Sequence, residues 1–145
     1  MHTPCTKIQW TVAGAAWLLA SVLLAGTPSR AAGEEVGVEV KPVRVEQLRN
    51  VPGQTLTAVV VTYAPAGKSG GHQHAGNVFA YVLSGAIRSE NSATGPVKVY
   101  QAGESFFEPP GSQHLISENA SATEPASLLA VFVADDGARL TSFDK

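Results

Sequence analysis

Cysteine is nearly absent from this chain of 145 residues, which has a single one, Cys5. One thiol cannot form a disulfide within the chain, so the fold has to form without such a cross-link. Cys5 also lies in an N-terminal segment that we expect to be removed. The mature protein would then have no thiol, so an oxidising compartment could not damage it by oxidising a cysteine.

Basic residues are also few and scattered. Ten Lys and Arg stand against twelve Asp and Glu, which gives a net charge of −2 at pH 7. Removal of Lys7 and Arg30 with the N-terminal segment leaves eight basic and twelve acidic residues, a net charge of −4. Binding to nucleic acid needs clustered Lys and Arg, so we expect no nucleic-acid partner. The sequence also has no run of like charges, internal repeat or heptad pattern.

Residues 1–31 have the features of a secretory signal peptide. A weakly basic start is followed by residues 8–26, which are almost free of charge, and Ser29 and Ala31 place small residues three and one before a cut. We therefore expect cleavage after Ala31 and a periplasmic or secreted protein. An uncleaved N-terminal membrane anchor is the alternative, because residues 8–26 are just long enough to span a bilayer.

Residues 32–145 remain as a single domain, large enough to bury a core of its own. Runs of β-branched and aromatic residues recur there every 8 to 12 residues or so, separated by glycine and proline turn signals, and we find no amphipathic helix. This pattern predicts an all-β fold, a sandwich or a single antiparallel barrel. We expect residues 78–90 to form a hairpin. The expected strands are residues 54–63, 78–83, 86–90, 97–100, 105–107, 114–117 and 127–134.

Three of the four histidines lie in two short segments. His72 and His74 are two residues apart, so in an extended strand both side chains point to the same face. His114 follows a proline-glycine turn and can approach from a neighbouring strand. Imidazole suits Fe, Zn, Ni and Cu, and three histidines leave coordination positions open for a substrate. The pattern predicts a site for one divalent metal, although three ordinary surface or core histidines remain the alternative reading.

The two segments resemble the motifs of the cupin superfamily, G(X)5HXH(X)3-4E(X)6G and G(X)5PXG(X)2H(X)3N. Residues 103–119 fit the second motif from Gly103 as far as His114, and the closing asparagine is displaced by one, to Asn119. Residues 67–85 fit the first motif at both histidines and at the closing glycine, while its opening glycine is off by one.

The resemblance covers roughly residues 60–134 and implies a small jelly-roll β-barrel, the double-stranded β-helix of the cupins. It also implies that His72, His74 and His114 hold one divalent metal inside the mouth of the barrel, with Fe, Mn, Ni, Cu and Zn all open as its identity.

The glutamate of the first cupin motif is missing from this chain. Val78 stands at the position that satisfies both of the motif's spacings, and neither of its neighbours is a carboxylate. Strand alternation puts Val78, Ala80 and Val82 on one face, which the resemblance makes the inner one. We expect these three residues and Phe106 to line a pocket.

Glu108 is the carboxylate that the sequence offers in its place. Alternation puts Glu108 on the face of Phe106, but the proline turn that follows leaves open which face is inner. Inside the barrel, Glu108 would be a fourth metal ligand or a general acid or base, and so a catalytic residue. The alternative is a rim carboxylate in solvent or paired with a cation such as Arg88.

The resemblance leaves more than one function open. The first is a metal-dependent enzyme for a small-molecule substrate, of the dioxygenase, isomerase or lyase type. The second is a non-catalytic module that binds or senses a small ligand or a metal, and an inert structural barrel is a third. Phe79 and Tyr81 lie on the strand face opposite Val78, which is consistent with sheet packing or a homodimer contact.

Overall fold

The computed structural model describes residues 35–144, and the expected signal peptide or anchor lies outside this range. Within it, all regular structure is β, and no helix is long or apolar enough to cross a membrane. The strands are β1 (Val36–Gln47), β2 (Gln54–Ser69), β3 (His72–His74), β4 (Asn77–Ser84), β5 (Ala86–Asn91), β6 (Gly95–Gln101), β7 (Ser105–Glu108), β8 (Gln113–Asn119), β9 (Ala126–Asp135) and β10 (Thr141–Phe143).

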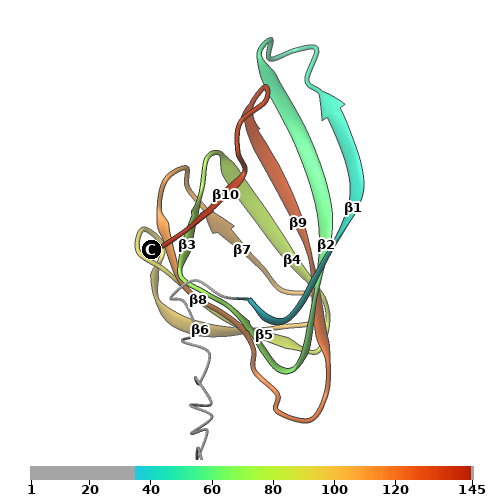
Figure 1. The fold of residues 1–145 in the computed structure, drawn as a ribbon, viewed down its shortest axis with the longest axis vertical. Coiled ribbons are helices and arrows are strands. Elements are labelled where there is room, and N and C mark those ends of the chain that lie inside the picture. The colour runs from blue at the N-terminus through green and yellow to red at the C-terminus, as the bar shows by residue number, and fades with distance from the viewer. Residues whose placement is uncertain (1–34, 145) are drawn as a thin grey trace, which may run out of the picture.

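The strands form two walls that face each other (Figure 1). One wall has the order β1-β2-β9-β4-β7, and the other has the order β6-β5-β8-β3-β10. Every pairing is antiparallel, and the far end of β2 joins the walls because Lys68 and Ser69 pair with β8. The result is a nearly closed antiparallel barrel, so the predicted jelly-roll fold class is confirmed.

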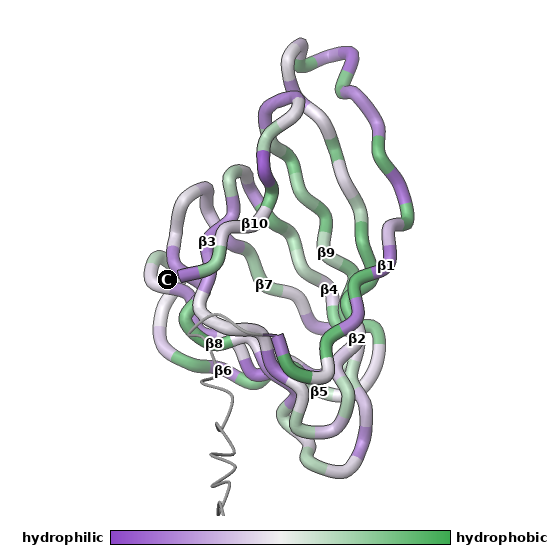
Figure 2. Tube along the Cα trace, in the orientation of Figure 1, coloured by the Kyte–Doolittle hydropathy of each residue, from purple (hydrophilic) through white to green (hydrophobic). Residues whose placement is uncertain are grey.

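The core follows from strict alternation along β4 and β9. In β4, Val78, Ala80 and Val82 are buried, while Phe79 and Tyr81 between them are exposed. Alternation in β9 buries every second residue in the same way, and Figure 2 shows the mainly hydrophobic composition of both strands. Burying one face of each strand fixes its register, because a slip by one residue would turn the apolar side chains to solvent.

The predicted hairpin over residues 78–90 is wrong. β4 pairs with β7 and β9, whereas β5 pairs with β6 and β8 in the opposite wall. Only Gly85 separates β4 from β5, and a hairpin needs a turn of at least two residues. Gly85 has a φ of 67°, a conformation that favours glycine. A Cβ atom added at this position would lie only 2.8 Å from the Cβ atom of Ala126. It therefore turns the chain from one wall into the other, at a place where no side chain fits.

Three strands lie outside the predicted ranges, namely β1, β10 and the three-residue β3 that carries His72 and His74. β1 is an edge strand that pairs only with β2 and is exposed along most of its length, so no buried face imposes a periodic pattern on it. β10 has only three residues and pairs with β3. β2 is longer than predicted and continues past Pro65 to Ser69, with Ala66 at a φ of 57°.

Candidate metal centre

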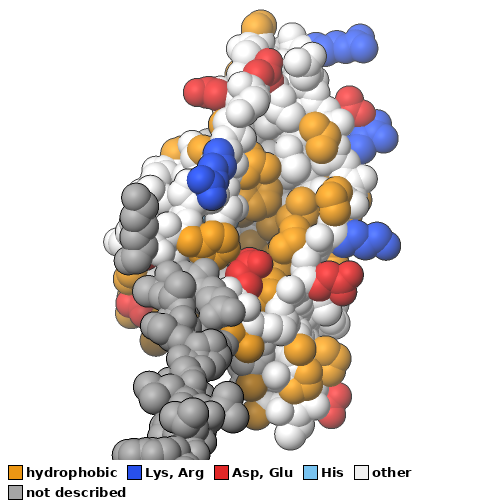
Figure 3. Space-filling model, in the orientation of Figure 1, with side chains coloured by type: hydrophobic (Ala, Val, Ile, Leu, Met, Phe, Trp, Pro, Cys, Tyr) orange, Lys and Arg blue, Asp and Glu red, His pale blue; other side chains and the backbone are white. Residues whose placement is uncertain are grey.

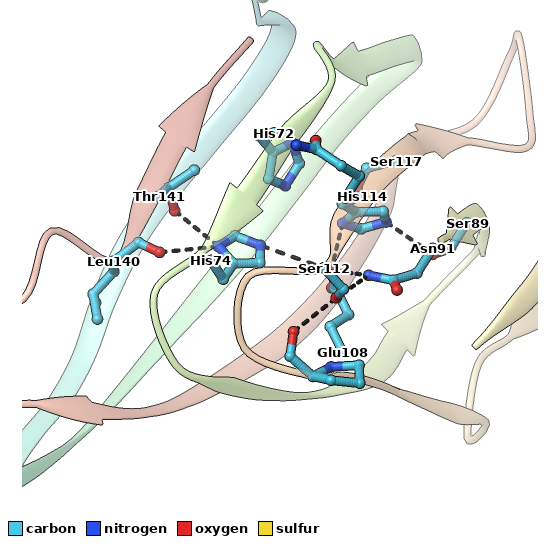
Figure 4. A network of polar contacts seen from close by, with 12 residues as sticks. His72, His74, Ser89, Asn91, Glu108, Ser112, His114, Ser117, Leu140 and Thr141 are labelled. Carbon is cyan, nitrogen blue, oxygen red and sulfur yellow. Dashed lines mark hydrogen bonds and ion pairs between the residues drawn. The ribbon is translucent and has the colours of Figure 1, made fainter. Parts of the chain in front are cut away.

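Short strands in the second wall bring the three predicted histidines together. His72 and His74 project from the same face of β3, and His72 pairs in register with His114 of β8. One nitrogen from each imidazole lies within 4.8 Å of the other two, and all three residues are buried. Figure 4 shows the rings converging from β3 and β8. The spacing in the sequence is therefore realised as a cluster that could hold a metal ion.

Hydrogen bonds to the protein orient the two rings of β3. The Nδ1 atom of His72 lies 2.7 Å from the carbonyl oxygen of Gly70. The Nδ1 atom of His74 lies 3.2 Å from the carbonyl oxygen of Leu140 and 3.1 Å from Oγ1 of Thr141. A carbonyl oxygen only accepts, so each Nδ1 carries the hydrogen and donates it. The Nε2 atom of each ring then keeps its lone pair, as a metal ligand requires.

The two nitrogen atoms of the His114 ring have different surroundings. Its Nε2 atom lies 2.8 Å from Oγ of Ser89, a buried residue of β5. Its Nδ1 atom is buried but has no hydrogen-bond partner. Most buried polar atoms in proteins are paired, and each exception asks for an explanation. A metal ion bound at this nitrogen would supply the partner, so the residues present fit a metal.

Glu108 completes the polar cluster from the other wall. Its Oε2 atom lies 3.0 Å from Nδ1 of His114, 3.9 Å from Nε2 of His74 and 3.2 Å from Nδ2 of Asn91. The contact with His114 is close, but it lacks the alignment of a hydrogen bond. Only 3% of Glu108 is exposed, so it is not a rim carboxylate. Arg88, its suggested partner on the rim, pairs with Glu118.

The cluster has the charge state that a divalent cation needs. Burial lowers the pKa of His72 to about 4 and also holds the pKa of His74 below its usual value. Burial raises the pKa of Glu108, but the His114 side chain and the other histidines outweigh it, so this pKa lies below its usual value. At neutral pH, His72 and His74 are therefore neutral imidazoles and Glu108 is a carboxylate.

A cavity of about 170 Å³ adjoins the cluster, and its opening is visible in Figure 3 among hydrophobic side chains. Of the four predicted pocket residues, Val78, Ala80 and Phe106 line it. Val82 is fully buried in the core and is not among the described lining residues. Each histidine also meets a different phenylalanine ring. The centroids are 5.1 Å apart for His74 and Phe132, 5.5 Å for His72 and Phe143, and 6.0 Å for His114 and Phe106.

Several residues that build the site were not singled out from the sequence. Ser89 and Asn91 of β5 point inward with Ile87, and strand alternation could have found them. Leu140 and Thr141 hold His74 from a segment that gave no strand signal. Their role depends on the pairing of β10 with β3, which no local pattern records.

Comparison with known proteins agrees with the fold. A family model described as a cupin domain matches residues 59–132. No curated protein matches the chain.

Solved structures share the fold at low identity. A structure of Bacillus subtilis oxalate decarboxylase is 25% identical with a TM-score of 0.52, and the match covers 61% of this chain and 23% of that one. A structure of the DMSP lyases RdDddP and RnDddQII is 20% identical with a TM-score of 0.52, and the match covers 62% of this chain and 44% of that one. A cupin-like protein of Thermotoga maritima is 16% identical with a TM-score of 0.58, and the match covers 81% of this chain and 89% of that one. The chain thus spans less than half of the decarboxylase and lyase chains.

Proposed function

Because this chain belongs to the cupin-domain family, we propose that it binds one divalent metal ion and acts as a metal-dependent enzyme on a small molecule. His72, His74 and His114 would hold the metal, and Fe, Mn, Ni, Cu and Zn all suit imidazole with a carboxylate nearby. The observation that carries this proposal is the convergence of three buried imidazoles, each of which has one nitrogen within 4.8 Å of the other two. The buried Nδ1 atom of His114, which has no hydrogen-bond partner, supports it.

Glu108 is the fourth ligand in this proposal. Its Oε2 atom lies 3.0 Å and 3.9 Å from nitrogens of two of the histidines, which are separations expected between neighbouring ligands about 2.1 Å from one ion. Asn91 donates a hydrogen bond to the same oxygen and fixes its direction. Three neutral imidazoles and one carboxylate would give the centre a single negative charge to balance a divalent ion.

The three histidines and Glu108 line the cavity, so a metal held by them would supply Lewis-acid chemistry to an oxygen atom of a substrate bound there. The protein's own part is to hold the four ligands, to exclude water with apolar walls and to orient the substrate. This arrangement suits the reaction classes that we expect from the family resemblance, namely those of a dioxygenase, an isomerase or a lyase.

A non-catalytic module that binds or senses a small ligand is the second candidate. One observation favours it. If Glu108 is a ligand, the only other carboxylate among the described residues that line the cavity is Glu35, and Glu35 is exposed. A cavity with no free acid or base suits binding without turnover. A metal-loaded protein that retains its ligand chemically unchanged over many hours would support this second function.

Elemental analysis tests the metal centre most directly. The full chain, purified from its own host without an affinity tag, should contain close to one equivalent of a single divalent metal per chain. A His74→Ala variant should lose most of this metal while its β-sheet circular dichroism persists. Gln73→Ala is the matched control, because this side chain lies between the two histidines but is exposed, and it should keep the metal. Unchanged metal content in His74→Ala would refute the proposal.

We also propose a homodimer formed through the outer face of β4 and β7. Phe79 and Phe107 pair directly across these strands and are 46% and 47% exposed. Large exposed apolar patches often mark interaction sites, and two-fold dimers are the commonest assemblies. Light scattering should give the mass of a dimer for the parent and of a monomer for Phe79→Asp. Leu115→Asp, at an exposed apolar residue of the other wall, should stay dimeric, and a monomeric parent would refute the dimer.

Export remains a proposal that the sequence of residues 1–31 supports. N-terminal sequencing of the protein from its native host should begin near Ala32. Recovery of intact Met1 in the membrane fraction would favour the uncleaved anchor.

A further inference from the structure

We infer that the molecule bound beside the metal is small, uncharged and largely apolar, about the size of a monocyclic phenol, and presents one or two adjacent oxygen atoms to the metal. This inference rests on the proposed metal centre and names the substrate class of that same site. The walls, the charges and the size of the cavity each support it.

The walls of the cavity beside the metal ligands are mainly apolar, and the polar side chains that also line it are Glu35, Tyr63, Ser69, Ser117 and Thr141. The rings of Phe106, Phe132 and Phe143 each contact one of the three histidines. Val78 and Ala80 add a further apolar wall from β4. A ligand whose body carries hydroxyl or amino groups would have to give up its hydrogen bonds to water against these side chains, which is unfavourable. A hydrocarbon or aromatic body would bury its surface there at no such cost.

The charges of the cavity disfavour an anionic substrate. No lysine or arginine is among the described residues that line it, and its two carboxylates are Glu35 and Glu108. A divalent metal with Glu108 has one positive charge left over. A neutral ligand, or one that loses a single proton on binding, is compatible with that charge. A dicarboxylate would exceed it, and the charged oxygen atoms that do not bind the metal would face the apolar wall with no cation to pair with.

The size of the cavity can accommodate such a ligand. Its volume is about 170 Å³, and an apolar cavity of about 150 Å³ holds benzene. A ring of six carbons with one or two oxygen atoms therefore fits beside the metal. The hydroxyl of Tyr63, also on the cavity wall, is bonded to Oγ of Ser117 at 2.7 Å, so the wall offers little polar recognition for a larger, polyhydroxylated ligand.

Catechol and oxalate form a matched pair of probes, because each offers two adjacent oxygen atoms to a metal but they differ in charge and apolar surface. The full chain loaded with Co²⁺ should be titrated with each probe, with the visible absorption of the bound cobalt as the signal. Equilibrium dialysis would verify that the cobalt stays on the protein. We expect catechol to bind at least tenfold more tightly than oxalate.

A charge introduced into the wall tests the physical reason. Val61 lines the cavity and is only partly buried, so the flexible stem of a lysine can be accommodated there. Val61→Lys should shift the preference towards oxalate by at least tenfold, whereas Val61→Met, the apolar control, should keep the preference of the parent.

The possible outcomes separate the two proposals. Cobalt bound, with oxalate binding as tightly as catechol or more tightly, overturns the substrate class and leaves the metal centre standing. No cobalt bound to the parent refutes the metal centre, and the substrate class with it. A preference for catechol that Val61→Lys reverses and Val61→Met retains supports the inference.

Discussion

Glu108 of β7 lies directly opposite Val78 of β4 in the antiparallel pair that the two strands form. Both side chains point into the barrel and both line the cavity. Val78 stands where the cupin motif has its glutamate. If Glu108 is the fourth ligand, as proposed, the carboxylate comes from the neighbouring strand, at the register position that faces Val78.

The first prediction is that Glu108→Gln lowers metal affinity by tenfold or more. The amide keeps the shape of the side chain but removes the negative charge next to the cation. Metal titration of the full chain, followed by calorimetry, measures the effect. Glu104→Gln is the matched control, because Glu104 is an exposed residue next to the same strand, and its affinity should equal that of the parent. Equal affinity in Glu108→Gln would exclude this residue as a ligand.

Moving the carboxylate to β4 provides a second prediction. Val78→Glu alone places two carboxylates opposite each other on one face, and like charges in that position repel. We expect this variant to be less stable than the parent without metal, and to recover part of the loss when metal is added. The double variant Val78→Glu with Glu108→Val should bind metal more tightly than Glu108→Val alone. Equal affinities of these two variants would show that the two positions are not interchangeable.

The pKa shifts predict a loss of stability in acid for the metal-free protein. The pKa of His72 is about 4 in the folded state, against a usual value of 6.5. Between these values the unfolded chain binds a proton that the folded protein does not, so stability falls as the pH falls from 6.5 to 4. A shift of this size corresponds to about 3 kcal/mol. The lowered pKa of His74 acts in the same direction.

The carboxylate continues this trend at lower pH. The folded-state pKa of Glu108 is below its usual value of 4.5, so its contribution to stability is lost as the pH falls past that value. Urea unfolding of the metal-free protein at pH 7, 5.5 and 4.5 measures the histidine contribution, and a further measurement at pH 3.5 adds that of Glu108. His72→Gln should remove a large part of the dependence between pH 6.5 and 4. A free energy of unfolding that is constant from pH 7 to 4.5 would contradict the assignment of His72 as a buried neutral imidazole.

The parts of the fold that could be predicted from the sequence are those with one buried face. β4 and β9 alternate strictly because one side of each strand packs in the core, and this period appears directly in the sequence. β1 is exposed along most of its length, so neither burial nor alternation marked it. The prediction of a hairpin around Gly85 was wrong because a short apolar run indicates that a strand is present but not which strand it pairs with.

The same distinction applies to the metal centre. The histidine cluster followed from an i, i+2 pair and a third histidine in a recognisable motif. The alternation that puts Glu108 with Phe106 was also visible in the sequence, but the inward direction of that face depends on how β7 packs against β4. Leu140 supports His74 through a hydrogen bond from the imidazole to its backbone carbonyl oxygen. Every residue has such a carbonyl, so this contact could not be predicted from the residue type.

The last prediction concerns this support. The Nδ1 atom of His74 donates to the carbonyl oxygen of Leu140 and contacts Oγ1 of Thr141, so the end of the chain determines which nitrogen of the ring faces the other histidines. Removal of such a partner of a metal-bound histidine typically costs 10- to 100-fold in metal affinity. A chain that ends at Arg139 loses both contacts and the ring of Phe143 against His72. We therefore expect its metal affinity to fall by about 100-fold, and that of Thr141→Val to fall by about tenfold.

Ser142→Ala supplies the control on the same strand, because Ser142 pairs with Gln73, between the two histidines, and it should bind metal like the parent. Nitrogen-15 NMR of the imidazoles provides a readout independent of affinity. In the metal-free parent, the hydrogen of His74 should reside on Nδ1, whereas in the shortened chain it should be distributed over both nitrogens. Retention of the Nδ1 hydrogen after truncation, together with unchanged affinity, would show that β10 covers the site without orienting it.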